Sequence, residues 1–208
     1  MELNTYPLVC TRGVVLYPNQ EIVIDVGRDT SVHAVENAQD NYDKKICLFS
    51  QKELEKENPG KEDIYPVGTL CEVRHIRRFD NFLRVKFRGI KRVKLNNWIN
   101  GSLSDLAEVE ILESEKQDAV EEEALIRMIA DELDRMQGQD RFVTKEIVME
   151  ISKGMGGEFL SDKAVQGLPL DIERKQQYLE TLGVNDRLMM LLQDMAKEKK
   201  MSEVEQQI

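Results

Sequence analysis

The strongest constraint on the fold is a change in the hydrophobic period near Glu113. Before this point, apolar and polar residues alternate over short runs such as 22–26 and 83–87, which is typical of half-buried β-strands. After it, apolar residues recur every three or four positions, which indicates amphipathic helices. We therefore predict an α+β protein, with a β-rich domain over residues 1–114 and a helical domain over residues 115–208.

The first half predicts antiparallel strands joined by short turns. A Pro-Asn pair at 18–19 separates two apolar runs, and an Asp-Asn pair at 80–81 is expected to close a tight hairpin, because both residues tolerate positive φ. Gly89 suggests a β-bulge in the strand that follows. Short strands with one helix inserted among them predict a small, partly closed β-barrel.

The inserted helix is predicted over residues 28–39, with Asp29 or Ser31 as its N-cap. In the second half, helices are predicted over 144–152 and 171–182, and again from about 185 onward. The first helix of that half should bury a stripe made of Val120, Ala124, Leu125, Met128, Ile129, Leu133 and Met136. Beyond Lys197 the sequence turns polar, so the last helix is expected to run out of the domain.

Composition and charge are those of a globular protein with two unlike halves. The chain has 208 residues, of which 41% are hydrophobic and 33% charged, and it contains no apolar run of the roughly 20 residues that span a bilayer. Its N-terminus lacks the pattern of a secretory signal, which favours a cytoplasmic protein. The net charge of −10 is concentrated in residues 113–208, which hold 22 acidic and 13 basic side chains.

The motifs of common catalytic sites are missing from the sequence. It has no phosphate-binding loop, no nucleophile elbow and no His-Glu-x-x-His zinc motif. The three cysteines, Cys10, Cys47 and Cys71, lie far apart inside apolar segments, which favours buried thiols over a metal site. We therefore expect no catalytic, cofactor-binding or metal-binding residues in this chain, and we interpret His33 as a solvated side chain.

A basic segment leaves two interpretations open. Residues 74–94 contain nine Lys and Arg and a single acid, with phenylalanines between them, a composition that could bind RNA. Basic residues at alternate positions of a strand, as at 84, 86 and 88, are also typical of the solvated face of a hairpin. Because the whole chain is acidic, with an isoelectric point near 4.9, nucleic acid is the less favoured partner.

Methionine is concentrated in the helical half. Eight of the nine methionines occur at or after Met128. Methionine adapts its shape, so such a region could form a groove for varied apolar segments, although methionine at helical spacing more often fills a core.

Several ordered motifs resemble one family, the N-terminal region of the Lon ATP-dependent protease. The stretch VGRDTSVHAVENA at 26–38 is similar to the family's V-G-R-x-x-S-x-x-A-x-E-x-A, and NPGKEDIYPVGT at 58–69 to its P-x-x-x-D-[LIF]-[YF]-x-V-G-T. Further matches are the Gly89 and Arg92 element and the Lys175-Gln176 element near the end. The resemblance covers nearly the whole chain.

The resemblance implies a PUA-like β domain followed by a helical subdomain that leads to an ATPase module absent from these residues. It implies a non-catalytic region that recognises unfolded or degron-bearing proteins and supports a homohexamer. The parent would be an ATP-dependent serine endopeptidase, with ATP and Mg bound in the absent module. A stand-alone PUA-like protein that binds RNA through residues 74–94 is the alternative.

Two groups of residues are the candidate substrate contacts. The exposed face of the helix after Gly27 could supply a charged contact, and a methionine-rich part of the last helix could supply an apolar one. These candidates are Arg28, Asp29 and His33 in the first group, and Met189, Met190 and Leu192 in the second.

Overall fold

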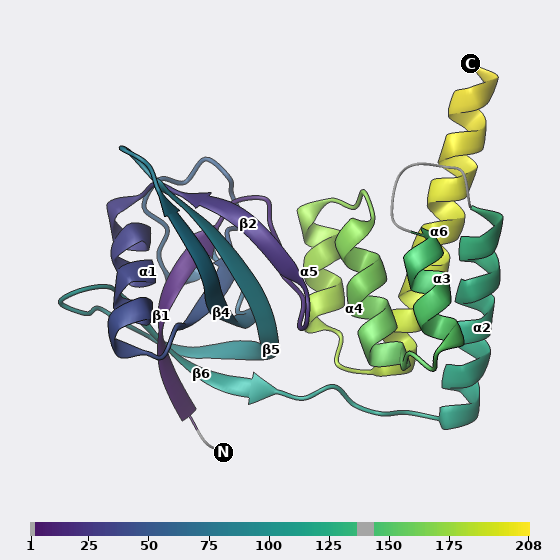
Figure 1. Ribbon diagram of the computed structural model, residues 1–208, viewed down its shortest axis with the longest axis horizontal. Coiled ribbons are helices and arrows are strands. Elements are labelled where there is room, and N and C mark those ends of the chain that lie inside the picture. The colour runs from purple at the N-terminus through teal and green to yellow at the C-terminus, as the bar shows by residue number, and fades with distance from the viewer. Residues whose placement is uncertain (1–2, 137–143) are drawn as a thin grey trace. The chain divides into compact units, whose positions relative to one another are not determined.

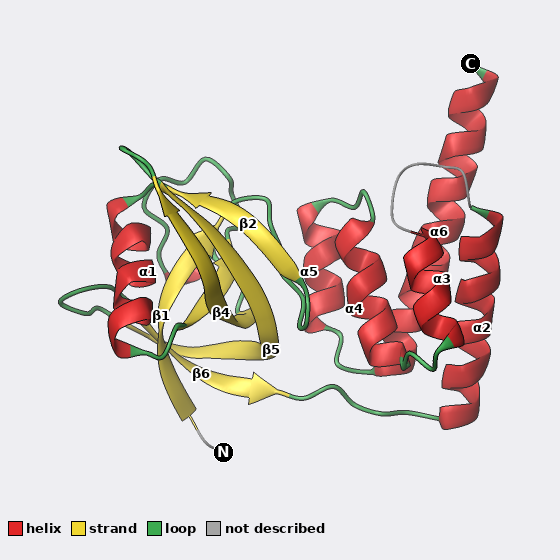
Figure 2. Cartoon of the chain, in the orientation of Figure 1, coloured by secondary structure: helices red, strands yellow, loops and turns green. Residues whose placement is uncertain are grey.

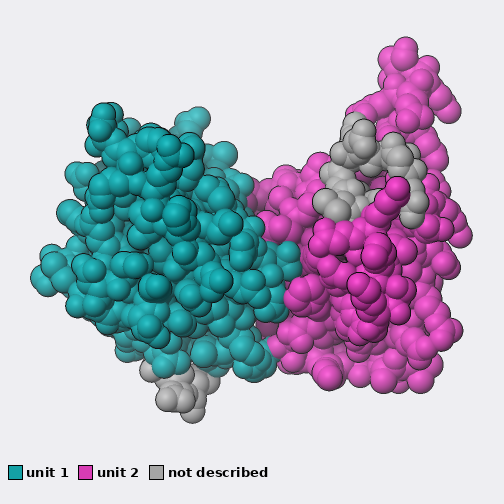
Figure 3. Space-filling view, viewed as in Figure 1, with its two compact units in different colours: residues 1–113 teal, residues 114–208 magenta. Residues whose placement is uncertain are grey.

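The computed structural model describes residues 3–136 and 144–208. Its contacts divide the chain into two compact units, unit 1 from Met1 to Glu113 and unit 2 from Ser114 to Ile208 (Figure 3). Unit 1 is built on a six-stranded sheet, and the regular elements of unit 2 are helices. The chain is therefore an α+β protein, as the change of period predicts.

Unit 1 contains the strands and one α-helix. Its elements in chain order are β1 (Leu3–Thr11), β2 (Glu21–Val26), α1 (Asp29–Asn41), β3 (Lys45–Ser50), the short 3-10 helix η1 (Lys61–Asp63), β4 (Val67–Arg78), β5 (Leu83–Ile99) and β6 (Leu106–Leu112) (Figure 1). The strand order is β2-β5-β4-β3-β1-β6, and β5 also pairs with β6. This additional pairing closes β1, β3, β4, β5 and β6 into a ring.

The predicted alternation places side chains as expected. Leu83, Val85 and Phe87 are buried on β5, while the residues between them are exposed. Helix α1 lies against β1 and β3 (Figure 2). It buries Val35 and Ala38 completely in a core shared with these strands, because its apolar residues recur at helical spacing on the face toward the sheet.

The first predicted turn and the bulge are confirmed. Asn19 has a φ of 64°, which asparagine tolerates better than most residues, and it follows Pro18 in a turn. On β5, Cys71 pairs with Gly89 whereas Leu70 pairs with Lys91, so one extra residue bulges out at this point.

The tight hairpin predicted at 80–81 is confirmed, but its expected positive φ is not, and the N-cap predicted for α1 is wrong. The turn at 80–81 is closed by the Phe79 N–H, which donates to the Phe82 carbonyl at 2.9 Å. The rings of these two phenylalanines stack with centroids 4.6 Å apart, which draws the hairpin ends together without a left-handed turn. The N-cap of α1 is Arg28, with no side-chain cap, so neither Asp29 nor Ser31 has that role.

Unit 2 contains five α-helices in the described residues. They are α2 (Ala119–Arg135), α3 (Thr144–Ser152), α4 (Gly157–Gly167), α5 (Ile172–Glu180) and α6 (Val184–Gln207). Helix α6 packs against α2 and α4, and its buried side includes Leu188, Leu191 and Met195, none of which is exposed. It begins one residue earlier than the predicted start near 185, because Gly183 supplies the N-cap.

The buried stripe of α2 is narrower than the predicted one. Leu125, Ile129 and Leu133 are buried, but Val120 is 77% exposed and Met128 is 56% exposed. The predictions for these two positions and for Ala124, which is exposed as well, were wrong because α2 is covered on one side only and these residues lie outside that side. Apolar side chains therefore remain on the surface of unit 2.

The segment 114–118 is bound to the start of α6. The Glu115 N–H donates to the Leu182 carbonyl at 2.8 Å. The Gln117 amide donates to the Asp186 carboxylate and accepts from the Asp186 N–H, both at 3.1 Å. These bonds hold the first residues of unit 2 against its last helix.

Arg187 is a fully buried guanidinium at the same place. It donates to the Ser161 hydroxyl at 3.1 Å, to the Ser114 hydroxyl at 3.1 Å and to the Thr181 carbonyl at 2.9 Å. The buried Asp162 carboxylate lies 4.0 Å away and balances its charge. Arg187 thus joins α4, α6 and the first residue of unit 2.

Candidate functional site

The charged candidates at the start of α1 do not form one surface. Asp29 and His33 are exposed, but Arg28 is half-buried. The Arg28 guanidinium turns toward the sheet, where it donates to the Cys10 carbonyl at 3.4 Å and to the side-chain oxygen of Gln51. Arg28 is therefore positioned by β1 and by the bridge residue after β3, while Asp29 and His33 remain in solvent.

A cavity of about 410 Å³ lies beside Arg28. It is lined by the end of β1, the end of β2 and the start of α1, namely residues 9–12, 24–28 and 31. A smaller cavity of about 150 Å³ shares Cys10, Arg28 and Ser31 and is lined on its other side by residues 57–59, Trp98 and Asp105. Arg28 thus contributes to both cavities.

Electrostatics near these cavities disfavour nucleophilic chemistry by the Cys10 thiol. Burial lowers the pKa of Arg28 from its ordinary value, and the nearby positive charge of Arg12 lowers it further. Burial raises the pKa of the Cys10 thiol to about 12, against a smaller opposing effect of Arg28. The thiol is therefore protonated near neutral pH, and protonated thiols are poor nucleophiles.

The apolar candidates lie on α6 but on different sides of it. Met189 is 43% exposed, whereas Met190 and Leu192 are half-buried. The Thr181 hydroxyl donates to the sulfur of Met190 at 3.6 Å, which places Met190 beside the end of α5. Met189 and Leu192 are three positions apart and so share another face of the helix. They form the more accessible part of the predicted apolar contact.

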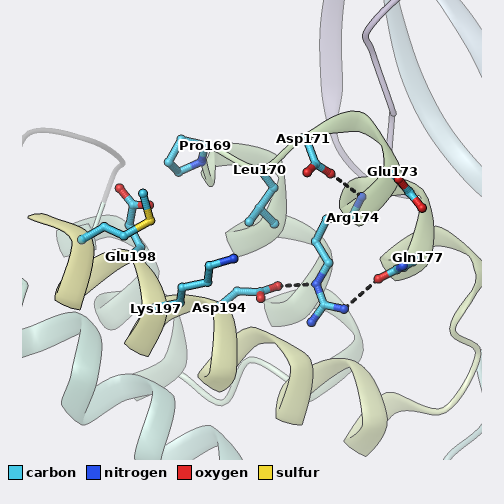
Figure 4. Close-up of a pocket in the computed structure, with 10 residues that line it drawn as sticks. Pro169, Leu170, Asp171, Glu173, Arg174, Gln177, Asp194, Lys197 and Glu198 are labelled. Carbon is cyan, nitrogen blue, oxygen red and sulfur yellow. Dashed lines mark hydrogen bonds and ion pairs between the residues drawn. The ribbon is translucent and has the colours of Figure 1, made fainter. Parts of the chain in front are cut away.

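A pocket of about 460 Å³ between α5 and α6 was not predicted (Figure 4). Its centre is the Arg174 guanidinium, which donates to the Asp194 carboxylate at 2.8 Å and to Gln177 at 2.7 Å. The buried Tyr178 hydroxyl donates to the same carboxylate at 2.6 Å, and its ring lies 5.4 Å from the guanidinium carbon. The hydrogen bond to Asp194 raises the pKa of Arg174.

The remaining lining of that pocket is mixed. Pro169, Leu170 and Met201 add apolar surface, while Asp171 accepts from the Arg174 N–H at 2.8 Å as the cap of α5. The Lys175-Gln176 motif points to this part of the chain. Nothing in the spacing, however, pairs Arg174 with an aspartate on another helix, so the pocket itself could not be predicted from the residue pattern.

Carboxylates neutralise much of the basic segment 74–94. Six of its nine cations lie within 4.0 Å of an acidic side chain, in the pairs Arg74–Glu72, Arg78–Glu36, Arg84–Asp25, Lys86–Glu21, Arg88–Glu21 and Lys91–Glu113. A seventh, Arg92, is only 2% exposed. The hydrogen bond from Arg84 lowers the pKa of Asp25, so this pair stays charged at neutral pH. The segment is mainly a solvated face of β4 and β5, and acids of β2 are among its ion-pair partners.

Clusters of metal-binding side chains are not found in the described ranges 3–136 and 144–208. Cys47 and Cys71 are fully buried, and burial raises the pKa of each thiol. Within the same ranges, no helix has both the length and the apolar composition needed to cross a membrane.

A sheet-based unit followed by a helical unit, with a cavity on each, defines this chain as an α+β protein. The same fold occurs in the N-terminal domain of a Lon protease from the Mycobacterium avium complex, with a TM-score of 0.76 and 18% identity over 93% of this chain and 98% of that one. The family model of the ATP-dependent protease La (LON) substrate-binding domain matches residues 5–197. The chain belongs to this family.

Curated relatives are whole Lon proteases. The Lon protease of Buchnera aphidicola is 31% identical over 208 residues, which are 100% of this chain and 27% of that protein. The Lon protease of Syntrophomonas wolfei is 33% identical over 211 residues, again 100% of this chain and 26% of that protein. The chain thus spans about a quarter of the length of these relatives.

Proposed function

We propose that this chain captures unfolded or degron-bearing proteins for an ATP-dependent serine endopeptidase and contributes to its assembly as a homohexamer. The main support is the match of the substrate-binding domain family over residues 5–197. ATP and Mg would be bound by an ATPase module outside these residues. The chain itself would contribute binding and no bond cleavage.

The surfaces of both units suit weak binding to many sequences. Exposed apolar side chains of unit 2, such as Met189 and Met128, can contact the apolar residues that folded proteins hide. At the start of α1, Asp29 and His33 present polar groups that can select among such segments. Contacts of this kind are individually weak, so the affinity is expected to be in the micromolar range, about −8 kcal/mol.

The binding of an unfolded protein tests the proposal. A fluorescently labelled protein, reduced and alkylated so that it cannot fold, is titrated with the chain and followed by anisotropy, and the same protein in its native form is the control. Saturable binding of the unfolded form alone is expected. Equal binding of both forms, or of neither, would contradict the proposal.

Matched variants test the two candidate contacts. Met189→Asp should weaken binding of the unfolded protein, while Val204→Asp should not, although both residues lie on α6 and are similarly exposed, at 43% and 50%. For the charged contact, Arg28→Glu combined with Asp29→Lys is compared with Asp40→Lys near the other end of α1. A contact whose variant binds as tightly as its control is not part of the site.

Sedimentation velocity tests the proposed contribution to assembly. If the chain supports a hexamer, its sedimentation coefficient should rise with protein concentration, since weak self-association is populated by mass action. A single monomeric species at all accessible concentrations would restrict the proposal to substrate capture. Addition of ATP and Mg should leave the melting temperature of the chain unchanged.

A further inference from the structure

Two strand edges in unit 1 are left without a neighbouring strand and line the same cavity. Strand β1 pairs with β6 through Leu3–Pro7 only, so its last residues pair with β3 alone. Strand β2 is the terminal strand of the sheet and pairs only with β5. The lining of the 410 Å³ cavity beside Arg28 includes residues 9–12, at and just after the end of β1, and residues 24–27, at and just after the end of β2.

Hydrogen bonds identify the main-chain groups on these edges. Successive residues of a strand direct their N–H and C=O groups to opposite sides. On β1, the Thr11 carbonyl points toward β3 and accepts from the Gln51 N–H, whereas the Leu8 N–H points away from β3 and donates to the Asp105 carbonyl. Because Cys10 is two residues after Leu8, its main-chain groups also point away from β3. The Cys10 carbonyl accepts a hydrogen bond from the Arg28 guanidinium at 3.4 Å. A side chain thus occupies the acceptor that a neighbouring strand would use.

The same reasoning applies to β2. The Gly89 N–H donates to the Gln20 carbonyl at 2.9 Å, so alternate residues from Gln20 onward direct their main-chain groups to β5. The residues between them, Val23 and Asp25, direct their main-chain N–H and C=O groups to the open edge of β2. Val23 is 55% exposed, which agrees with an uncovered edge. Exposed edges of this kind are templates for the addition of another strand.

Side chains around the cavity define the chemistry of an incoming strand. Arg12 and Arg28 both line it, and neither has a carboxylate within 4.0 Å in the part of the chain that the structure describes. Asp25 is the one acid in the lining, and Arg84 holds it through two hydrogen bonds of 2.7 and 3.0 Å. Two guanidinium groups without an acid partner complement an acidic side chain.

We propose that an extended polypeptide segment with an acidic side chain adds as a strand to the open edge of β2, with its carboxylate at Arg12 and Arg28. This inference rests on the proposed capture of unfolded proteins and gives it a mechanism. Main-chain hydrogen bonds recognise any sequence that can extend, so they combine tolerance of sequence with rejection of folded helices. The acidic side chain then sets the preferred position along the segment.

Peptides test the proposal without altering the protein. The reference is a labelled peptide about seven residues long, the length of an ordinary strand, with alternating valine and threonine, one central glutamate and both termini blocked. Alternate N-methylation removes its main-chain donors and should weaken binding by about tenfold or more, or 1.4 kcal/mol. Replacement of the glutamate by glutamine should weaken binding several-fold and reduce its salt dependence.

A variant pair tests the same edge from the protein side. Val23→Pro removes one N–H from the open edge of β2, and Val23→Ala retains it. We expect the first to weaken peptide binding at least fivefold relative to the second, a difference of about 1 kcal/mol. Trp98 fluorescence and thermal melting show whether each variant is folded, and the peptide series remains decisive if the proline variant is not.

The outcomes separate this inference from the proposed function. Equal binding of the N-methylated and reference peptides would overturn strand addition, even if the labelled unfolded protein still binds. Equal binding of the glutamate and glutamine peptides would overturn the role of the two arginines. If the unfolded protein fails to bind while the reference peptide binds and N-methylation abolishes that binding, the proposed function fails and the edge site stands.

Discussion

Gly89 lies so close to Tyr17 that a Cβ atom at Gly89 would stand 2.2 Å from the Tyr17 carbonyl oxygen. The neighbouring atom belongs to the main chain, so it cannot move aside as a flexible side chain would. Gly89→Ala should therefore lower the free energy of unfolding of unit 1 by about 3 kcal/mol. Urea unfolding followed by the fluorescence of Trp98, the sole tryptophan, measures this value.

Gly27→Ala is the matched control for Gly89→Ala. The nearest atoms to a Cβ at Gly27 are 3.9 Å away, an ordinary contact distance. The control should change the unfolding free energy by less than about 0.5 kcal/mol. Similar losses in both variants would mean that the close contact with Tyr17 does not decide the effect.

Removal of the buried Arg187 guanidinium should destabilise unit 2. Arg187→Met removes the hydrogen bonds to two hydroxyls and one carbonyl and the cation that lies 4.0 Å from the buried Asp162 carboxylate, so the expected loss is about 3 kcal/mol. Arg127→Met is the control, because the Arg127–Glu123 pair is exposed and should contribute less than about 0.5 kcal/mol. Urea unfolding followed by far-UV circular dichroism, which reports mainly the helices of unit 2, compares the two variants.

Alkaline pH should destabilise unit 1 through its buried thiols. Burial raises the pKa of Cys10 from 9.0 to about 12 and raises those of Cys47 and Cys71 in the same direction. Above about pH 9 the unfolded chain loses these protons while the folded chain keeps them, so stability is full below that pH. It then falls with rising pH by about 1.4 kcal/mol per unit for each thiol.

Cys10→Ala isolates the contribution of one thiol. Urea unfolding of both proteins across the range from neutral to about pH 11 gives the slope of stability against pH, and the variant should have the shallower slope. Lysines and tyrosines titrate in both proteins, so their effects cancel in the difference. Parallel slopes would show that the Cys10 thiol has no raised pKa.

RNA should not bind measurably to the basic segment. Six of its nine cations have an acidic neighbour, and the chain carries a net charge of −10, so few counterions could be released from a nucleic acid. Filter binding with labelled single-stranded RNA should stay at background at low salt. Retention that falls steeply as salt is added would instead support the stand-alone RNA-binding alternative.

The fold class could be predicted because the signals that define it are local. A period of two or of 3.6 residues is read directly from the order of apolar positions, as at Leu83, Val85 and Phe87. Helix α4 was missed for a local reason as well. It begins after Gly156 without a side-chain cap, and its short apolar stripe follows a glycine-rich stretch that resembles a loop.

The candidate site could not be predicted in detail because its contacts join segments that are distant in sequence. The sequence predicts Arg28 on the exposed face of a helix. The pairing of β1 with β3, however, brings Cys10 and Gln51 within reach of its guanidinium. The Arg174–Asp194 pair likewise depends on the packing of α5 on α6. Exposure of Met128 follows from which side of α2 is covered, and the period of the helix alone does not define that side.

The pairing of β1 with β6 limits how early unit 1 can fold as the chain is synthesised. Leu3 pairs with Glu110 and Pro7 with Leu106, so the first strand of unit 1 to leave the ribosome has a neighbour in the last strand of the unit. Local elements such as α1 and the β4–β5 hairpin can form before that, but the ring cannot close until β6 has emerged. Until then β1 presents an uncovered edge, so in a newly made chain this segment needs protection from premature pairing.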